Sequence, residues 1–226
     1  MVVKMIEDKK FTFLISAGRT GSTLLLGVLN SIDGYTIVGE NHNAYVDLRS
    51  FYEKMLSATQ AYESNDMGYE SVNSWYARYD KEDLKQYVRE LCASLIDNKA
   101  HTVGFKEIRY PNLGFKLTGH LNWMHSVFKP RFIYLTRNIE DVCKSEWWAK
   151  NPAKSKTTLT QFNNDMIKHI ANHPAQEWFH LTYEDMVDNR LEKLFEFLDE
   201  PYDAKKLQEE VLNVRHGYKT KGKWPL

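Results

Sequence analysis

The stretch FTFLISAGRTGSTLLL, residues 11–26, decides the fold, because a short apolar run breaks into a turn of small residues and then resumes with helical periodicity. This order predicts a strand, a loop and a helix. Gly18 and Gly21 allow the backbone to fold closely around an anion. Backbone amides near Gly21, Ser22 and Thr23 would then lie at the positive end of the following helix, where anions bind. The stretch therefore predicts a phosphate-binding loop.

The side chains of this loop favour the same chemistry. Arg19 adds a charged donor, and the hydroxyls of Ser22 and Thr23 add neutral ones. The loop departs from the ATP-binding pattern G-x-x-x-x-G-K-[ST], because Gly18 is followed by a glycine only three residues later and no lysine precedes the hydroxyl pair. It is typical of phosphate binding without being a Walker A motif.

A second segment, RFIYLTRNIEDVCKSEWW at residues 131–148, repeats the order of strand and helix and ends its strand in Arg137. A helix that begins near Asn138 would carry Ser145 two turns along it. Arg137 at the strand end and the Ser145 hydroxyl could then share one anion. The segment predicts a second anion site.

Together, R-T-G-S-T at 19–23 and R-N-x-x-D-V-x-x-S at 137–145 resemble the two signatures of the sulfotransferases that use 3'-phosphoadenosine 5'-phosphosulfate (PAPS). The form of these motifs is similar to that in the carbohydrate, tyrosyl-protein and bacterial members of the family. In that family the first loop holds the 5'-phosphosulfate, and the second signature holds the 3'-phosphate. The resemblance implies donor binding by Arg19, Thr20, Gly21, Ser22, Thr23, Arg137 and Ser145, with adenosine 3',5'-bisphosphate as the product.

Further elements extend the resemblance over roughly residues 11 to 200. Val38-Gly39-Glu40 is similar to a G-E element whose glutamate is the family's catalytic base. Val103-Gly104-Phe105-Lys106 matches a strand that carries a catalytic lysine. The run LTYEDMV at 181–187 resembles the family's Y-E-D-L element. The resemblance thus implies catalytic roles for Glu40, Lys106 and Arg19.

The chemistry of sulfuryl transfer fits these positions, because an acceptor hydroxyl must lose a proton while the leaving phosphate gains stabilised negative charge. Glu40 follows the second predicted strand and Lys106 ends the third, at the edge where open α/β sheets place ligands. His42 is the alternative base, since cytosolic members of the family use histidine. In a purely structural interpretation Glu40 caps the following segment or pairs with a lysine, and Lys106 pairs with Glu107 or another carboxylate.

Composition places the chain in a narrow class. Its 226 residues suit one α/β domain, and we expect a single domain over 1–226. Lysine plus arginine and aspartate plus glutamate number 30 each, which argues against nucleic acid or an anionic membrane as a partner. The charged N-terminus argues against a signal peptide or anchor and favours a soluble, cytoplasmic protein. The spacing of Cys92 and Cys143 and of the histidines predicts neither a disulfide nor a metal site.

Alternating short apolar runs and longer amphipathic ones predict a P-loop-like, three-layer α/β fold with a central, mostly parallel sheet flanked by helices. A helix over 80–98 is predicted with Asp80 as its N-cap. The aromatic and polar segment 42–79 is interpreted as the acceptor-side wall and lid. The expected strands cover 11–16, 35–38, 102–106, 131–136 and 178–182, and the apolar face of the helix carries Leu84, Tyr87, Val88, Leu91 and Leu95.

The hypothesis from the sequence is therefore a sulfotransferase that moves a sulfuryl group from PAPS to a hydroxyl on a carbohydrate, a small alcohol or a phenol. One alternative is a P-loop nucleotide or small-molecule kinase that uses ATP and Mg²⁺. Another is a non-catalytic protein that binds adenosine bisphosphate or another anion. The tail lysines, Lys219, Lys221 and Lys223, are assigned either to closure over the donor or to a basic tail. The acceptor and the oligomeric state stay open at this stage.

Overall fold

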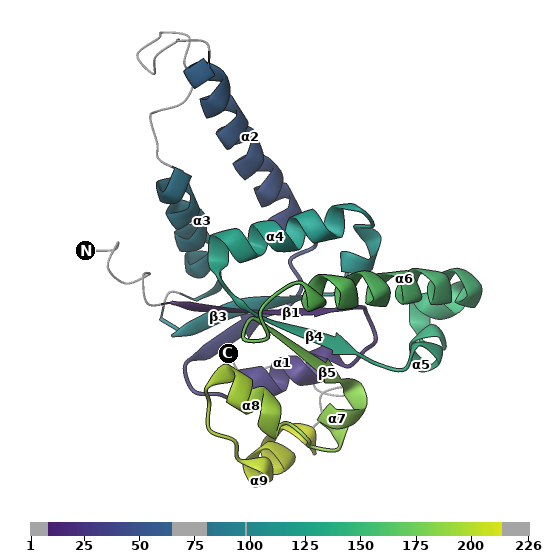
Figure 1. The fold of residues 1–226 in the computed structure, drawn as a ribbon. Coiled ribbons are helices and arrows are strands. Elements are labelled where there is room, and N and C mark those ends of the chain that lie inside the picture. The colour runs from purple at the N-terminus through teal and green to yellow at the C-terminus, as the bar shows by residue number, and fades with distance from the viewer. Residues whose placement is uncertain (1–8, 65–80, 98, 214–226) are drawn as a thin grey trace.

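A computed structural model describes residues 9–64, 81–97 and 99–213. In these ranges five strands form one sheet in the order β2-β3-β1-β4-β5, and every neighbouring pair is parallel (Figure 1). The predicted α/β class and the predicted strands are confirmed, with ends that agree to within one residue. The strands are β1 Lys10–Ser16, β2 Tyr35–Val38, β3 Thr102–Glu107, β4 Arg131–Thr136 and β5 Trp178–Thr182.

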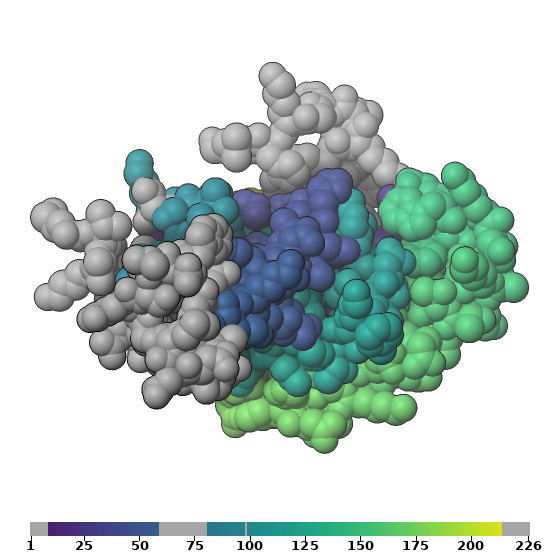
Figure 2. Space-filling view, turned by 90° about the horizontal axis from the view of Figure 1, so that it is seen from above, coloured from purple at the N-terminus to yellow at the C-terminus, as the bar shows by residue number. Residues whose placement is uncertain are grey.

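Helices cover both faces of the sheet and complete three layers (Figure 1). One face carries α2 Ala44–Ser64, α3 Lys81–Ile96, α4 Lys116–Phe128, α5 Ile139–Cys143 and α6 Pro152–Ala171. Figure 2 looks onto this face, where α2, α4 and α6 form a continuous cover. The other face carries α1 Ser22–Asn30, α7 Tyr183–Val187, α8 Glu192–Leu198 and α9 Ala204–Leu207. Short turns of helix lie at η2 Tyr110–Asn112, η3 Glu146–Lys150 and η4 Gln208–Leu212.

The central strand β1 explains why the sheet is covered on both sides. Phe13 and Ile15 face one apolar cluster while Leu14 faces the other, and all three are fully buried. Gly104 in β3 allows the neighbouring strands to approach, because a Cβ there would lie 1.6 Å from the carbonyl oxygen of Thr12. The continuous apolar runs of the sequence are therefore central parallel strands.

The helix predicted over 80–98 is present as α3, but its buried face differs from the predicted one. Leu84 and Val88 lie in the core together with Cys92 and Ala93, whereas Tyr87, Leu91 and Leu95 are exposed. The spacing of apolar residues indicates a helix. It does not decide which row of side chains along that helix packs on the sheet. The predicted N-cap, Asp80, lies outside the described residues.

Two tyrosines of the aromatic segment at 42–79, which is interpreted as the acceptor-side wall, pack against the core. Tyr45 packs on Phe105, with ring centroids 4.3 Å apart, and Tyr52 packs against Trp123 within the core. Aromatic area buried in this way stabilises α2 on the sheet. Residues 65–79 and the tail lysines Lys219, Lys221 and Lys223 lie outside the described residues. No helix in the described part of the chain is long and apolar enough to span a bilayer.

Candidate active site

The predicted site residues gather at one edge of the sheet, where the parallel strands end. The loop at 17–23 follows β1, Glu40 follows β2, Lys106 lies near the end of β3, and Arg137 follows β4. In open α/β sheets this edge is where ligands bind. Parallel topology therefore brings together four stretches that are distant in the sequence.

Residues 17–23, which we call the donor loop, take the backbone form that the glycines predict. Gly21 precedes α1 with a φ of 92°, and a Cβ there would lie 2.4 Å from the Tyr183 ring. No side chain caps α1, so the first amides of the helix, from Ser22 and Thr23, are not covered by a cap. The Thr20 hydroxyl is buried and donates to the carbonyl of Ala17 at 2.9 Å. Thr20 thus stabilises the loop from within.

The donor loop contacts the second predicted anion segment directly. Arg19 Nε donates to Ser145 Oγ at 2.9 Å, and Arg19 Nη1 lies 3.1 Å from a carboxylate oxygen of Glu146. Arg137 Nη1 donates to the carbonyl of Arg19 at 3.3 Å. Both arginines and the serine therefore belong to one cluster, in which Glu146 supplies a negative charge that the sequence prediction did not include.

Ser145 reaches this cluster by a route other than the predicted one. Asn138 does begin a helix, since its side chain accepts from the amides of Glu140 and Asp141, but α5 ends at Cys143. Ser145 follows in an extended conformation, with φ −108° and ψ 125°. The chain then folds back over the donor loop, where the Trp148 indole donates to the carbonyl of Gly18 at 3.0 Å. Ser145 therefore meets Arg19 through tertiary contacts and not from a second turn of α5.

Arg137 presents an unsatisfied donor at the cluster. Its guanidinium lies over the Tyr183 ring, 4.3 Å from the centroid. Its Nε is buried and has no hydrogen-bond partner within the described ranges. A buried charged donor without an acceptor is unfavourable, so this position suits an anionic ligand.

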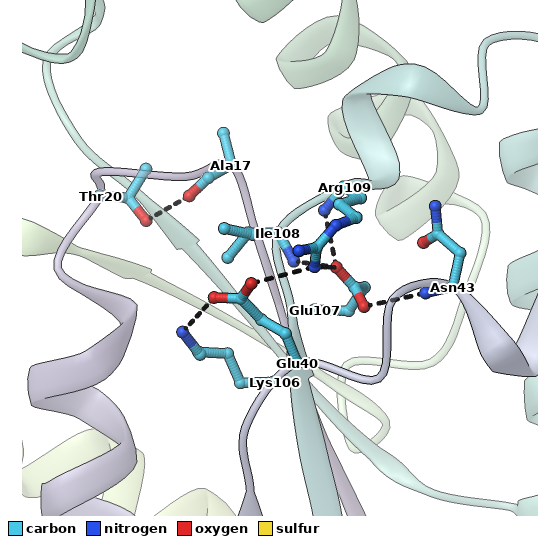
Figure 3. Close-up of polar contacts among 8 residues, drawn as sticks. All are labelled: Ala17, Thr20, Glu40, Asn43, Lys106, Glu107, Ile108 and Arg109. Carbon is cyan, nitrogen blue, oxygen red and sulfur yellow. Dashed lines mark hydrogen bonds and ion pairs between the residues drawn. The ribbon is translucent and has the colours of Figure 1, made fainter. Parts of the chain in front are cut away.

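A second group of charges lies at the same edge of the sheet, where β2 and β3 end. It consists of Glu40, Lys106, Glu107 and Arg109, which we call the carboxylate cluster. Glu40 accepts from Lys106 Nζ at 2.8 Å and from Arg109 Nη1 at 2.9 Å, one bond to each oxygen (Figure 3). Burial by itself would raise the pKa of Glu40, but the hydrogen bonds and charges of Lys106 and Arg109 outweigh it and hold the pKa below its ordinary value. Glu40 is therefore a carboxylate at neutral pH.

Glu107 and Arg109 complete this cluster and were not predicted as site residues. The Glu107 side chain is fully buried, and it accepts from Arg109 Nη1 at 3.0 Å and from the backbone amides of Ile108, Arg109 and Asn43. A signal exists in the sequence, because K-E-I-R places three charges directly after the apolar run of a buried strand. The structural interpretation is confirmed for both residues, since Glu40 does pair with a lysine, and the carboxylate that Lys106 meets is Glu40 and not Glu107.

His42, the alternative base, lies two residues after Glu40 in a strained turn. Its backbone has a φ of 56°, and within the described residues its side chain makes no hydrogen bond or ion pair. A general base is usually oriented by a partner. Among the described residues Glu40 has such partners and His42 has none.

Comparisons with known proteins agree with this geometry. The sequence matches the Sulfotransferase family over residues 12–204. The fold is similar to the sulfotransferase domain from the curacin biosynthetic pathway, with a TM-score of 0.55 and 16% identity over 88% of this chain and 77% of that one. It is also similar to the sulfotransferase domain of the Synechococcus PCC 7002 olefin synthase, with a TM-score of 0.54 and 18% identity over 86% and 76%. At such identities the likeness shows a shared fold. No curated protein matches the sequence.

Proposed function

The chain belongs to the sulfotransferase family of enzymes, and on that premise we propose that it transfers a sulfuryl group from PAPS to an acceptor hydroxyl with Glu40 as the general base. The acceptor is a carbohydrate, a small alcohol or a phenol. The alternative of an ATP-dependent kinase finds no support in the family match. The proposal is carried by one observation above the others, the 2.9 Å contact between Arg19 and Ser145 that joins the two anion-binding motifs.

The cluster formed by Arg19, Arg137 and Ser145 fits PAPS chemically. The donor carries two anionic groups, a 5'-phosphosulfate and a 3'-phosphate. Arg19, with the uncapped start of α1 at Ser22 and Thr23, would hold the first group. Arg137, whose buried Nε has no acceptor within the described ranges, would hold the second together with Ser145.

The carboxylate cluster suits the chemical step. When bound, PAPS supplies an activated sulfuryl group whose departure leaves negative charge on a phosphate. Glu40 is a carboxylate near the same sheet edge and would accept the proton of the attacking hydroxyl. Lys106 and Arg19 would stabilise the leaving charge, a role that magnesium has in kinases. In this assignment Lys106 exchanges its partner Glu40 for the leaving group.

Calorimetric titration in EDTA tests the donor class. We expect adenosine 3',5'-bisphosphate to bind more tightly than AMP, and Arg137→Ala to weaken only the bisphosphate. Charge-assisted hydrogen bonds contribute about 1.5–3 kcal/mol each, so the selective loss is about tenfold or more. The matched control is Arg131→Ala, because Arg131 begins the same strand that Arg137 follows and pairs with Asp199 at the opposite edge.

The same titrations separate the alternatives. Equal weakening of both nucleotides in Arg137→Ala would remove its 3'-phosphate role. Binding of ATP with Mg²⁺ but not of adenosine 3',5'-bisphosphate would favour a kinase. Tight bisphosphate binding without turnover of PAPS over a panel of sugars, alcohols and phenols would favour a non-catalytic binder.

A further inference from the structure

We propose that Glu107 and Arg109 are positioning residues that hold Glu40 in place and keep it ionised until it accepts the proton of the attacking hydroxyl. The inference rests on the proposed role of Glu40 as the base, and it deepens the description of that site. It starts from a buried acidic residue, Glu107, for which the proposed chemistry has no direct use. A buried carboxylate is unfavourable unless it is paired and hydrogen-bonded, so its contacts indicate what it does.

One nitrogen of Arg109 connects the two carboxylates of the cluster. Arg109 Nη1 lies 2.9 Å from Glu40 Oε2 and 3.0 Å from Glu107 Oε1 (Figure 3). Glu107 is fully buried, whereas a quarter of the Glu40 side chain is exposed. The guanidinium is thus anchored on its buried side and limits the movement of the more exposed carboxylate.

Glu107 also holds the backbone that follows Glu40. Its second oxygen, Oε2, accepts from the amide of Asn43 at 3.2 Å. His42 and Asn43 have φ values of 56° and 65°, in the left-handed region that residues other than glycine adopt rarely. The Glu107 bond stabilises this strained turn between Glu40 and α2. The buried Glu107 side chain therefore positions both Arg109, which contacts Glu40, and the backbone turn that follows Glu40.

The two cations that contact Glu40 differ in how freely they can move to another partner. Lys106 carries a compact charge on a flexible stem and can turn to another anion, whereas the planar guanidinium of Arg109 stays bonded to Glu107. When Lys106 turns to the leaving charge, Glu40 loses one of its two cations and becomes more basic, which favours transfer of the hydroxyl proton to it. Arg109 keeps its contact with Glu40 and holds the carboxylate in position for that transfer. Among the described residues, the charged groups in contact with Glu40 are Lys106 and Arg109, with Glu107 behind Arg109 and His42 two positions along the chain.

A titration of the ligand-free protein tests this without reference to activity. The carboxyl ¹³C signal of Glu40 is assigned by its loss in Glu40→Gln and followed against pH. Removing a neighbouring cation disfavours the carboxylate, so Arg109→Ala is expected to raise the pKa of Glu40 by about one pH unit or more. Arg109→Lys keeps the charge and should raise it less. Lys85→Ala, which removes an exposed pair with Glu82 on α3, is the matched control.

A second readout tests the link between Glu107 and the turn. In Glu107→Gln an amide nitrogen competes for the place of the oxygen that accepts from Asn43, so hydrogen exchange of the Asn43 amide should become faster. An unchanged exchange rate would overturn the positioning of the turn. An unchanged pKa of Glu40 in both Arg109 variants would overturn the role of Arg109, and Arg109→Lys serves if the alanine variant does not fold.

Activity separates this inference from the function on which it rests. Protonation of the base lowers the rate at acid pH, so Arg109→Ala should move the acid limb of kcat to higher pH, and Glu40→Gln should remove that limb. If Glu40→Gln kept wild-type activity and its acid limb, the base assignment would fall whatever the titration showed. If the limb depended on Glu40 but did not move in Arg109→Ala, only the positioning role would fall.

Discussion

The donor loop and the carboxylate cluster lie at the same edge of the sheet and hold their ion pairs in different ways. In the first, Arg19 and Glu146 are 38% and 55% exposed. In the second, Lys106 is 9% exposed and Glu107 is fully buried. Exposed pairs are screened by solvent and contribute little to stability, whereas a broken buried pair leaves an uncompensated charge. The exposed Arg19–Glu146 pair can therefore exchange its partner for a ligand at little cost, whereas the pair of Arg109 with the buried Glu107 is expected to stay in place.

The largest expected effect concerns stability. Glu107→Ala should lower the free energy of unfolding by about 3 kcal/mol, because it removes the buried partner of Arg109 and the acceptor of three backbone amides. Glu146→Ala should lower it by about 1 kcal/mol or less. Denaturant unfolding of both variants gives the two values. Equal losses would remove the distinction between the two regions.

The next effect is on the rate of transfer. Glu40→Gln keeps the size of the side chain and should lower kcat about a hundredfold or more, as loss of a general base does. Affinity for adenosine 3',5'-bisphosphate should stay close to that of the wild type. His42→Ala should have a much smaller effect on kcat. The measurement is formation of the bisphosphate from PAPS with a panel of hydroxyl acceptors.

A matched control for that experiment is Glu53→Gln, which removes an exposed glutamate that pairs with Arg49 on α2. It should leave the rate unchanged. Wild-type activity in Glu40→Gln with a large loss in His42→Ala would instead assign the base to His42 and leave the carboxylate cluster a purely structural role.

The smallest effect tests whether Glu146 competes with the donor. Glu146→Gln frees Arg19 and should tighten binding of adenosine 3',5'-bisphosphate by a few-fold, since an exposed ion pair is worth about 0.2–1 kcal/mol. The gain should shrink at high salt. Glu140→Gln makes the same charge change nearby but breaks a pair with Lys156, so it should not tighten binding. Equal gains in both variants would indicate a general effect of net charge.

Local patterns in the sequence predict the strands and the glycine turn of the donor loop well. Apolar runs become buried parallel strands, and Gly21 takes the left-handed backbone that suits a residue without a Cβ. The predicted sites also meet at one edge, because strands that run in parallel end together. The strands and the glycine turn can be predicted because they depend on residues that are close in the sequence. The meeting of the sites follows from one rule, that parallel strands end at the same edge of a sheet.

Other features depend on contacts between distant parts of the chain. Ser145 meets Arg19 through a fold-back that the Trp148 indole stabilises, and not through the predicted second helical turn. Tyr45 packs on Phe105 against the core, a contact between segments that are far apart along the chain. The spacing of apolar residues correctly predicts that α3 is a helix. It does not predict which side of that helix is buried, because this depends on how the helix packs on its neighbours.

The sequence by itself thus determined the α/β class, the family and the residues that the motifs name, because these follow from local order and composition. Only the tertiary structure decided how the charges pair. Lys106 could have met any nearby carboxylate, and it meets Glu40 because β2 and β3 are adjacent in the sheet. Arg109 and Glu107 become part of the site for the same reason. Ion pairs act over a few ångströms in space, and that distance is unrelated to separation along the chain.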